Sequence, residues 1–346
     1  ETEKRPIGMP TVENKVLERA VVMLLEPIYE QEFLPCSYGF RRGRSPHGAC
    51  QALRKAVKSM GGGYVLDVDV RKYFDTIDHE HLRNILSKRI GDGVIKRLLG
   101  KWLKAGVWEA GMVTYPEAGS PQGGVISPLL SNIYLHEVLD QWFEHEIKPK
   151  LEGRAELVRF ADDFVVVCEK HGDAVKLLDL VRERFAAYGL EIHPEKTRIA
   201  DFSDPYKTGR KAETFDFLGF THYWGRTPRG GYAVKSRTSS KKYRGSLQKI
   251  AQWCKKNRHL PVKHQHRTLC QKVQGHYAYY GIRGNFESIR RYRQKVRRLW
   301  HHWLLRRSRE RHNKKQLWEL IDKHLPLPPA RIVHTWHSPQ MTFNFS

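Results

Sequence analysis

The feature that most constrains the fold is a pair of adjacent acids, Asp162 and Asp163, set between two hydrophobic runs. The surrounding segment reads Glu156-Leu-Val-Arg-Phe-Ala-Asp-Asp-Phe-Val-Val-Val-Cys168. This order of strand, two acids and strand predicts a tight β-hairpin with the acids at its tip. Adjacent carboxylates repel each other, and oxygen ligands suit Mg²⁺, so a divalent metal is a natural partner. For an isolated pair, a solvated turn would be the simpler interpretation.

A second acidic segment upstream has a matching context. Tyr64-Val-Leu-Asp-Val-Asp-Val70 alternates as a strand does, and side chains two apart in a strand share a face. We therefore expect Asp67 and Asp69 to point the same way. An acid in so apolar a strand is costly unless it is paired or binds metal. We interpret Asp67 as a solvent-facing acid of an edge strand and Asp69 as a metal ligand.

The two acidic segments together resemble the palm of reverse transcriptases, particularly those encoded by bacterial group II introns. The resemblance is carried by Asp69-Val-Arg-Lys-Tyr-Phe-Asp75 and Phe160-Ala-Asp-Asp163, with Phe160 where tyrosine is commoner in the family. Further matches run nearly end to end in the family's order, which makes the resemblance specific. They are Arg5-Pro-Ile-Gly-Met-Pro10, Ser37-Tyr-Gly-Phe-Arg41, Gly119-Ser-Pro-Gln-Gly-Gly-Val-Ile-Ser-Pro128, Gly189-Leu-Glu-Ile-His-Pro-Glu-Lys-Thr197 and Phe215-Asp-Phe-Leu-Gly-Phe220.

The resemblance implies that Asp69, Asp162 and Asp163 are the catalytic metal ligands, with the backbone carbonyl of Val70 as a further ligand. Carboxylates on neighbouring strands can bridge two Mg²⁺ ions about 4 Å apart, and Mn²⁺ is the expected substitute. One ion would lower the pKa of a primer 3′-hydroxyl. The other would hold the triphosphate and the leaving pyrophosphate.

Phe74 lies five residues after Asp69, where the family places a bulky gate. An aromatic ring under the sugar would clash with a ribose 2′-hydroxyl and so select deoxynucleotides. The alternative is an ordinary core aromatic, which is the usual place of phenylalanine. Only the resemblance favours the gate.

Four more residues are expected to bind the nucleotide. Arg5 and Arg41 resemble fingers residues, and Arg5 would contact the triphosphate. Gln122 lies in a glycine-containing loop whose backbone can approach a ligand closely, and Ser127-Pro128 then begins a helix as cap and first residue. Lys196 resembles the lysine of the family's fourth palm motif, near the pyrophosphate, although a solvated charge is the simpler interpretation of a lone lysine.

The excess positive charge is confined to the last third of the chain. Residues 226–346 contain 29 Lys or Arg against 4 Asp or Glu, whereas the whole chain has 61 against 37. The first 225 residues are therefore nearly neutral, and the basic third opposes its own compaction without a polyanion. Aromatic side chains interleaved with the charge suit stacking on RNA bases. They are Trp253, Tyr277, Tyr279, Tyr280, Trp300, Trp303 and Trp318.

The basic third also reads as helical, over 239–256, 265–280 and 286–307. In the last of these segments one apolar stripe is more typical of a packing core than of a base-stacking platform. The stripe is Ile289, Tyr292, Val296, Leu299, Trp300 and Trp303. Basic side chains around it, and two lysines upstream, are the expected RNA contacts. They are Arg290, Arg291, Arg297, Arg298, Lys241 and Lys242.

The expected fold is α+β, a right-hand polymerase with an antiparallel palm sheet covered by helices on one face. We assign 1–62 to partial fingers and 63–225 to the palm, with fingers helices inserted at about 78–115. Residues 226–346 would form an all-helical thumb or maturase region. Further elements are predicted as helices over 11–29, 46–58, 78–90, 92–105, 128–146 and 173–188, and as strands over 197–202 and 214–220. Thr11 and Asp173 are the expected caps of the first and last of these helices, and Ser45-Pro46 is expected to open the second.

Composition fits this organisation. A chain of 346 residues with 40% hydrophobic content permits a sizeable core and two or three subdomains. The five cysteines form no CxxC pair, so neither a zinc site nor a disulfide framework is indicated, and the bacterial cytoplasm is the simplest compartment. The expected partners are an RNA template, a DNA primer, deoxynucleoside triphosphates and structured intron RNA, with no membrane.

Several functions remain open at this stage. The first choice is an RNA-directed DNA polymerase with maturase activity on a group II intron. A related enzyme of CRISPR spacer acquisition or phage defence would share the chemistry, and a purely RNA-binding splicing factor would not. The aromatic at 74 argues against an RNA-dependent RNA polymerase. The family normally has a fingers extension before the Arg5 motif, so we also expect a fragment, a trimmed chain or part of a fusion. We expect no endonuclease module.

Overall fold

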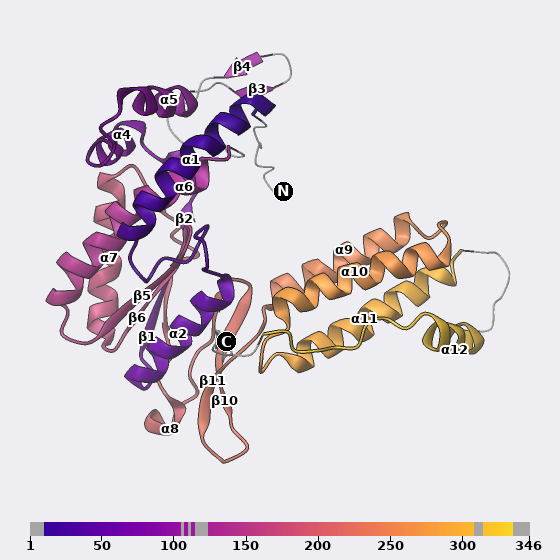
Figure 1. Ribbon diagram of the computed structural model, residues 1–346. Helices are drawn as coiled ribbons and strands as arrows, with labels where there is room; N and C mark the ends of the chain where they lie inside the picture. Colours follow the sequence, from indigo (N-terminus) through magenta and orange to yellow (C-terminus); the bar gives the residue numbers. More distant parts are fainter. Residues whose placement is uncertain (1–9, 105–106, 110–111, 115–123, 308–313, 335–346) are drawn as a thin grey trace, which may run out of the picture. The chain divides into compact units, whose positions relative to one another are not determined.

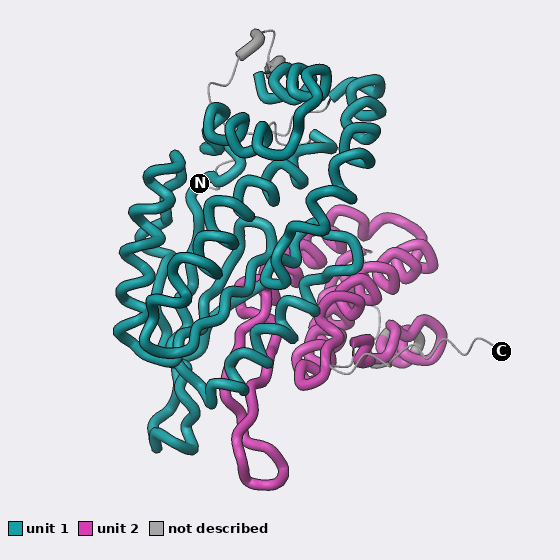
Figure 2. Tube along the Cα trace, turned by 60° about the vertical axis from the view of Figure 1, so that its left-hand side comes forward, with its two compact units in different colours: residues 1–218 teal, residues 219–346 magenta. Residues whose placement is uncertain are grey.

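The computed structural model describes residues 10–104, 107–109, 112–114, 124–307 and 314–334. The chain divides into two compact units, Glu1–Leu218 and Gly219–Ser346 (Figure 2). This division falls before the hairpin that opens the second unit, whereas the predicted boundary at 225/226 would cut through that hairpin. The names fingers, palm and thumb remain predictions for the two units.

Unit 1 is built around a four-stranded sheet, and helices make up most of the rest (Figure 1). Its helices are α1 (Val12–Glu32), α2 (Pro46–Met60), α3 (Tyr73–Thr76), α4 (His79–Ser87), α5 (Gly93–Leu103), α6 (Ser127–Leu135), α7 (His171–Ala187) and α8 (Pro205–Thr208). Its strands are β1 (Tyr64–Val68), β2 (Val70–Arg71), β3 (Val107–Glu109), β4 (Met112–Thr114), β5 (Ala155–Phe160), β6 (Asp163–Cys168), β7 (Glu191–Ile192), β8 (Arg198–Asp201) and β9 (Phe215–Phe217).

The four-stranded sheet has the order β5-β6-β1-β8, and all its pairs are antiparallel. This confirms the α+β class and the predicted antiparallel sheet. The prediction that helices cover one face is wrong, because consecutive residues of the central strands, such as Val65 and Leu66, are both fully buried. Helix α7 packs on β1 and β6, and α2 packs on β5 and β6 (Figure 1). A continuous apolar run such as Phe164–Cys168 suits a strand buried on both sides.

Helices α1 and α2 begin where the sequence predicts. The Thr11 hydroxyl caps α1 by accepting a hydrogen bond from the backbone N–H of Asn14 at 3.3 Å. The Ser45 hydroxyl accepts the N–H of Gly48 at 3.0 Å, and Pro46 occupies the first turn of α2. A capping oxygen satisfies a backbone donor that has no partner within the helix.

Helix α6 is capped differently from the prediction. Ser127 lies inside the helix and is not its cap. The buried carboxylate of Glu18, from α1, accepts the backbone N–H groups of Val125 and Ile126 at 2.5 and 3.2 Å. A carboxylate also complements the positive end of a helix dipole. After α6 the chain continues through two π-helical turns, His136–Gln141 and Phe143–Ile147.

Helix α7 begins at His171, two residues before the predicted cap. The prediction that Asp173 caps this helix is wrong, because its carboxylate is used elsewhere. It accepts the backbone N–H groups of Glu152 and Gly153 at 3.2 and 2.8 Å. Asp173 therefore fixes the loop that leads into β5.

Unit 2 opens with a β-hairpin, β10 (Phe220–Arg226) and β11 (Tyr232–Thr238), and continues as helices. The helices are α9 (Ser240–Lys256), α10 (Val262–Tyr280), α11 (Phe286–Leu304) and α12 (Lys314–His324). The expectation of an all-helical region is therefore wrong at its start. The single strand predicted over 214–220 is broken at Leu218 and Gly219, which both adopt left-handed backbone angles (φ 50° and 78°).

The apolar stripe of α11 forms the core of unit 2, as predicted. Ile289, Tyr292, Val296 and Trp300 are buried in one cluster with residues of α9 and α10. Tyr277 and Trp300 are at most 1% exposed, so neither ring is available to stack on RNA. For Trp300 this agrees with the packing core predicted from the stripe, and for Tyr277 the predicted stacking is wrong. Along the described part of the chain, none of the helices combines the length and apolar character needed to cross a bilayer.

Candidate active site

The two acids of the first motif lie at a two-residue hairpin turn, as predicted. Phe160 pairs with Asp163, so Ala161 and Asp162 form the loop between β5 and β6. Ala161 has a φ of 55°, and a positive φ at the first loop residue is typical of the type II′ turn. We call Phe160–Asp163 the acidic turn. Its backbone is in a strained region for a residue with a side chain.

The segment Ser37-Tyr-Gly-Phe-Arg41 packs directly on the acidic turn. A Cβ at Gly39 would lie 2.2 Å from the backbone nitrogen of Ala161, so only glycine fits. The Asn132 side chain, from α6, donates to the Gly39 carbonyl at 2.6 Å. Backbone hydrogen bonds also tie Cys36 and Tyr38 to Arg159, at 2.8 Å each. These contacts hold β5 and the acidic turn against residues 36–39.

Asp69 lies beside the acidic turn because β1 and β6 are neighbours. Val68 pairs with Phe164, and the antiparallel register continued by one residue brings Asp69 alongside Asp163. The Asp69 carbonyl accepts the backbone N–H of His193 at 2.8 Å, and its own N–H donates to the Thr197 hydroxyl at 3.4 Å. The turn between β7 and β8 thus fixes the backbone of Asp69.

Asp67 lies in a different place from the one predicted. It belongs to β1, a central strand paired on both sides, and not to an edge strand. Burial first, and then the negative charge of Asp163, raise the pKa of Asp67 to about 7, although Arg198 opposes this shift. Asp69 and Asp216 add to the negative field. Asp67 thus lies within the electrostatic field of several other carboxylates.

Lys196 meets Asp69 across the site. Its ammonium nitrogen lies 3.4 Å from a carboxylate oxygen of Asp69. The two side chains are 56% and 44% exposed, so both are open to solvent and to a ligand. The structure therefore brings together two residues that the sequence placed in one site.

The donor set suits magnesium, because carboxylate oxygens on adjacent strands are the ligands this ion prefers. Burial is the main cause of the raised pKa of Asp67, and a cation would offset the second cause, the negative charge of Asp163. Within the described ranges, however, no three Asp, Glu, His or Cys side chains stand arranged around one metal position. The metal set Asp69, Asp162 and Asp163, with the carbonyl of Val70, remains a prediction.

Phe74 lies in the short helix α3, which follows Asp69 and β2. Its ring is partly buried against the core and meets the Tyr73 ring edge-on, with centroids 5.3 Å apart. Tyr73 is itself fixed, because its hydroxyl donates to the Ser131 carbonyl at 2.8 Å. Packing on one side leaves the other side of Phe74 partly exposed, so the gate remains a prediction.

Arg41 has a structural role in place of the nucleotide contact that we expected. Its guanidinium side chain is 3% exposed and forms an ion pair with Glu30 at 2.7 Å. It also donates to the carbonyls of Leu34 and Ser37, at 2.8 and 2.9 Å. These bonds direct its donors into the protein interior. Arg5 and Gln122 lie outside the described residues, so their predicted contacts are untested.

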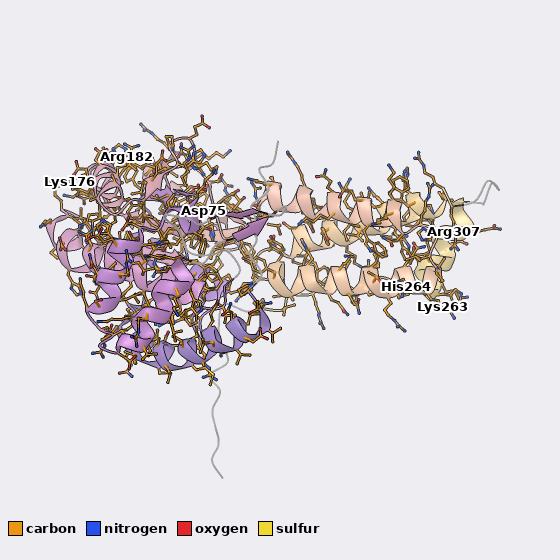
Figure 3. The ribbon with its side chains drawn as sticks, turned by 90° about the horizontal axis from the view of Figure 1, so that it is seen from above. Asp75, Lys176, Arg182, Lys263, His264 and Arg307 are labelled. Atoms are coloured by element: carbon orange, nitrogen blue, oxygen red, sulfur yellow. The ribbon has the colours of Figure 1, made fainter. Side chains whose placement is uncertain are left out.

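The predicted RNA contacts of unit 2 fall into two groups. Arg290 and Arg291 are exposed and share Glu287, whereas Arg297 pairs with Asp322 and stacks on Trp318, 4.2 Å from its ring centre. Arg297 therefore joins α11 to α12. The second group consists of exposed basic side chains on α9 and α11, namely Lys241, Lys242 and Arg298. Figure 3 shows Lys263, His264 and Arg307 where α10 begins and α11 ends.

An antiparallel sheet with carboxylates at a hairpin tip and on the neighbouring strand is typical of a polymerase palm. The family model described as reverse transcriptase (RNA-dependent DNA polymerase) matches residues 1–222. This chain belongs to the reverse transcriptase family. The family that the sequence motifs indicated is thereby confirmed.

Individual relatives cover parts of the chain. Protein YkfC of Escherichia coli (strain K12) is 33% identical over 237 residues, which are 58% of this chain and 61% of YkfC. Group II intron-encoded protein LtrA of Lactococcus lactis subsp. cremoris is 40% identical over 148 residues, 43% of this chain and 24% of LtrA. The match thus spans less than two thirds of either relative. An apo telomerase structure from Candida tropicalis aligns with a TM-score of 0.49 at 12% identity, covering 89% of this chain and 50% of that one.

Proposed function

We propose that this chain is an RNA-directed DNA polymerase of the group II intron type, acting by two-metal nucleotidyl transfer. The observation that carries the proposal is the meeting of Asp69, Lys196 and the acidic turn at one end of the four-stranded sheet. Asp69 directly follows β1, the acidic turn joins β5 to β6, and Lys196 lies in the turn between β7 and β8. Membership of the reverse transcriptase family supports the same reaction.

Each residue then has a definite task. Asp69, Asp162 and Asp163 would hold the metal ions through their carboxylates. When bound, two Mg²⁺ ions activate the attacking hydroxyl and neutralise charge on the phosphates. Lys196 would place its positive charge, and a proton, beside the leaving pyrophosphate. Phe74 would exclude a 2′-hydroxyl by contact with the sugar.

Unit 2 is proposed to bind the primer–template duplex and structured intron RNA, which is the maturase part of the function. The support is its charge, with 29 basic against 4 acidic residues over 226–346, and the exposed basic side chains of α9 and α11. Two of the four acids, Glu287 and Asp322, are occupied by arginines of α11. Phosphate binding would release counterions, so the affinity should fall steeply with salt.

The proposed partners are an RNA template, a DNA primer and deoxynucleoside triphosphates, with Mn²⁺ as the substitute for Mg²⁺. The proposed compartment is the bacterial cytoplasm. All five cysteines carry free thiols, which suits a reducing compartment. Cys50, Cys168 and Cys254 are buried.

Primer extension tests the proposal directly. The purified chain is given a DNA primer annealed to an RNA template, Mg²⁺, and either deoxy- or ribonucleoside triphosphates. We expect extension with deoxynucleotides, little with ribonucleotides, and none after chelation of the metal. A chain that binds RNA but extends no primer would be a splicing factor without polymerase activity, and the proposal would be wrong.

A further inference from the structure

Arg159 is a buried cation in the strand that leads into the acidic turn. Its side chain and that of Asp140 are both 0% exposed. The Arg159 Nε donates to one carboxylate oxygen of Asp140 at 2.7 Å, and Nη2 donates to the other at 2.5 Å. Burial opposes ionisation of Asp140, but the charge and hydrogen bonds of Arg159 outweigh it and hold the pKa of Asp140 below its ordinary value. The pair is therefore ionised inside the protein.

The other donors of Arg159 reach three further parts of the chain. Nη1 donates to the Asn132 side-chain oxygen and to the Ala161 carbonyl, each at 3.0 Å. Nη2 donates in addition to the Ser37 hydroxyl at 2.9 Å. A guanidinium has five N–H groups, and these bonds account for all five. Arg159 thus ties α6, the chain near Gly39 and the acidic turn to one point.

The bond to the Ala161 carbonyl bears directly on Asp162. That oxygen belongs to the peptide group that joins Ala161 to Asp162, and a peptide group is planar. A donor fixed on the oxygen therefore fixes the direction in which the backbone enters Asp162. Ala161 has a φ of 55°, and such a strained conformation persists only where its surroundings determine it. Gly39 confines the same turn through its close approach to the Ala161 nitrogen.

The position of Asp140 beside Arg159 is set by an unusual local structure. It lies in the π-helical turn His136–Gln141 that follows α6, and such turns are frequent at functional sites. Asn132, one helical segment earlier, accepts from Arg159 and donates to the Gly39 carbonyl at 2.6 Å. The two residues hold Arg159 from two directions, so its fork cannot rotate away from the turn.

We propose that Arg159 is a positioning residue that aims the Asp162 carboxylate at the metal site, through the carbonyl of Ala161. The inference rests on the proposed polymerase function and deepens it. The competing interpretation is a buried ion pair that serves folding alone. The two interpretations differ in what happens when folding is preserved and the bond to Ala161 is lost.

A double substitution separates them. Arg159→Met together with Asp140→Leu removes both buried charges at once, and well-packed apolar replacements of a buried ion pair are often neutral or stabilising. The Ala161 carbonyl nevertheless loses its donor. Arg159→Lys is the conservative companion, because it keeps a positive charge beside Asp140 but cannot form the fork. Ser37→Ala is the matched control, because it removes one bond of the same guanidinium and leaves the bond to Ala161 intact.

Four quantities are measured on the full chain: the melting temperature, kcat and KM for single-nucleotide incorporation, and the Mn²⁺ affinity by electron paramagnetic resonance without nucleotide or nucleic acid. We expect the double variant and Arg159→Lys to lose between about tenfold and 100-fold in kcat, with little change in KM for the nucleotide. Their Mn²⁺ affinity should fall several-fold, because one of the metal ligands, the Asp162 carboxylate, would no longer be oriented toward the ion. Ser37→Ala should keep both kcat and Mn²⁺ affinity.

A folded double variant with the kcat and Mn²⁺ affinity of the parent chain would overturn the inference. If the double variant does not fold, Arg159→Lys decides the question in the same way, and if neither folds the role is structural and the inference is wrong. Failure of the proposed function looks different. The parent chain would then extend no primer, while the Mn²⁺ measurement would still report whether Arg159 positions Asp162.

Discussion

The ammonium group of Lys196 lies 3.4 Å from a carboxylate oxygen of Asp69, although the two residues are 127 positions apart in the chain. The turn between β7 and β8 brings them together, because His193 and Thr197 bond to the backbone of Asp69. Both side chains are largely open to solvent, and an exposed ion pair contributes at most about 1 kcal/mol to stability. The contact therefore matters for the site more than for the fold.

Lys196→Met should lower the rate of nucleotide incorporation while leaving stability nearly unchanged. Loss of a proton donor and a positive charge near the pyrophosphate should cost about 100-fold or more in kcat. Single-turnover primer extension and thermal denaturation measure the two effects. Lys176→Met, at an exposed position of α7, is the control for removal of a lysine (Figure 3). Equal rates for the parent chain and Lys196→Met would remove Lys196 from the catalytic site.

Phe74→Val should admit ribonucleotides. The smaller side chain leaves room for a 2′-hydroxyl, so selectivity for deoxynucleotides should fall by about tenfold or more. Competition between deoxy- and ribonucleotides in primer extension measures the ratio of kcat/KM. Phe74→Tyr keeps the ring and should keep the selectivity. Unchanged selectivity in Phe74→Val would favour the core aromatic interpretation, since Phe74 also packs against the core.

The basic surface of unit 2 should be visible in the salt dependence of RNA binding. Removing two exposed charges, Arg291→Gln with Arg298→Gln, should weaken binding and reduce the log–log salt slope by about 1.5. Filter binding at several salt concentrations gives the slope. The matched control removes two exposed charges of unit 1, at Lys176 and Arg182 (Figure 3), and should change little. Equal slopes for both variants would refute the role of unit 2.

His276 should make unit 2 sensitive to acid. Burial lowers the pKa of His276 to about 4, and its ring stacks on Tyr292 at 3.6 Å. An unfolded histidine binds a proton below about pH 6.5, while the folded one stays neutral down to about pH 4. Its contribution to stability is therefore complete above pH 6.5 and is lost as the pH falls toward 4, by about 3 kcal/mol at most.

The comparison with His276→Phe isolates this effect. Phenylalanine keeps an aromatic ring against Tyr292 and cannot be protonated. Denaturant titrations between pH 7 and pH 4 should show the free energy of unfolding of the parent chain falling faster than that of the variant. Parallel curves would mean that His276 is protonated equally in the folded and unfolded states.

The sequence predicted the acidic turn well because its signal is local. Two acids between two apolar runs leave only a hairpin, and the observed pairing of Phe160 with Asp163 is what such a run requires. The helix starts at Thr11 and Ser45 were likewise predictable, since a capping side chain bonds to its own backbone neighbours. The apolar stripe of α11 followed from its helical spacing.

The failures share a different cause, which is the use of side chains by distant parts of the chain. Ser127 is the obvious cap of α6, yet Glu18 of another helix takes that place. Arg41 matches a fingers motif, but Glu30 and backbone carbonyls occupy its donors. Asp67 was misplaced because the pairing order of strands does not follow from their individual patterns.

Arg159 shows what signal a sequence reading can miss. An arginine in a strand that is mostly apolar is either exposed at an edge or buried with a partner. The partner, Asp140, lies 19 residues earlier, in a π-helical turn that the spacing of apolar residues does not predict. The strand pattern alone could therefore mark Arg159 as unusual, but it could not show that one of its five donors bonds to the acidic turn while the other four bond to Asp140, Asn132 and Ser37.

The most direct test of the account is single-turnover primer extension on an RNA template by the parent chain and by Asp162→Asn, with RNA affinity measured in parallel. Asparagine keeps the size of the side chain and removes its charge, so the fold and RNA binding should persist. We predict that Asp162→Asn loses DNA synthesis by about 1,000-fold or more while its RNA affinity stays within about twofold of the parent chain. Synthesis at the parent rate by a folded Asp162→Asn chain would contradict the account.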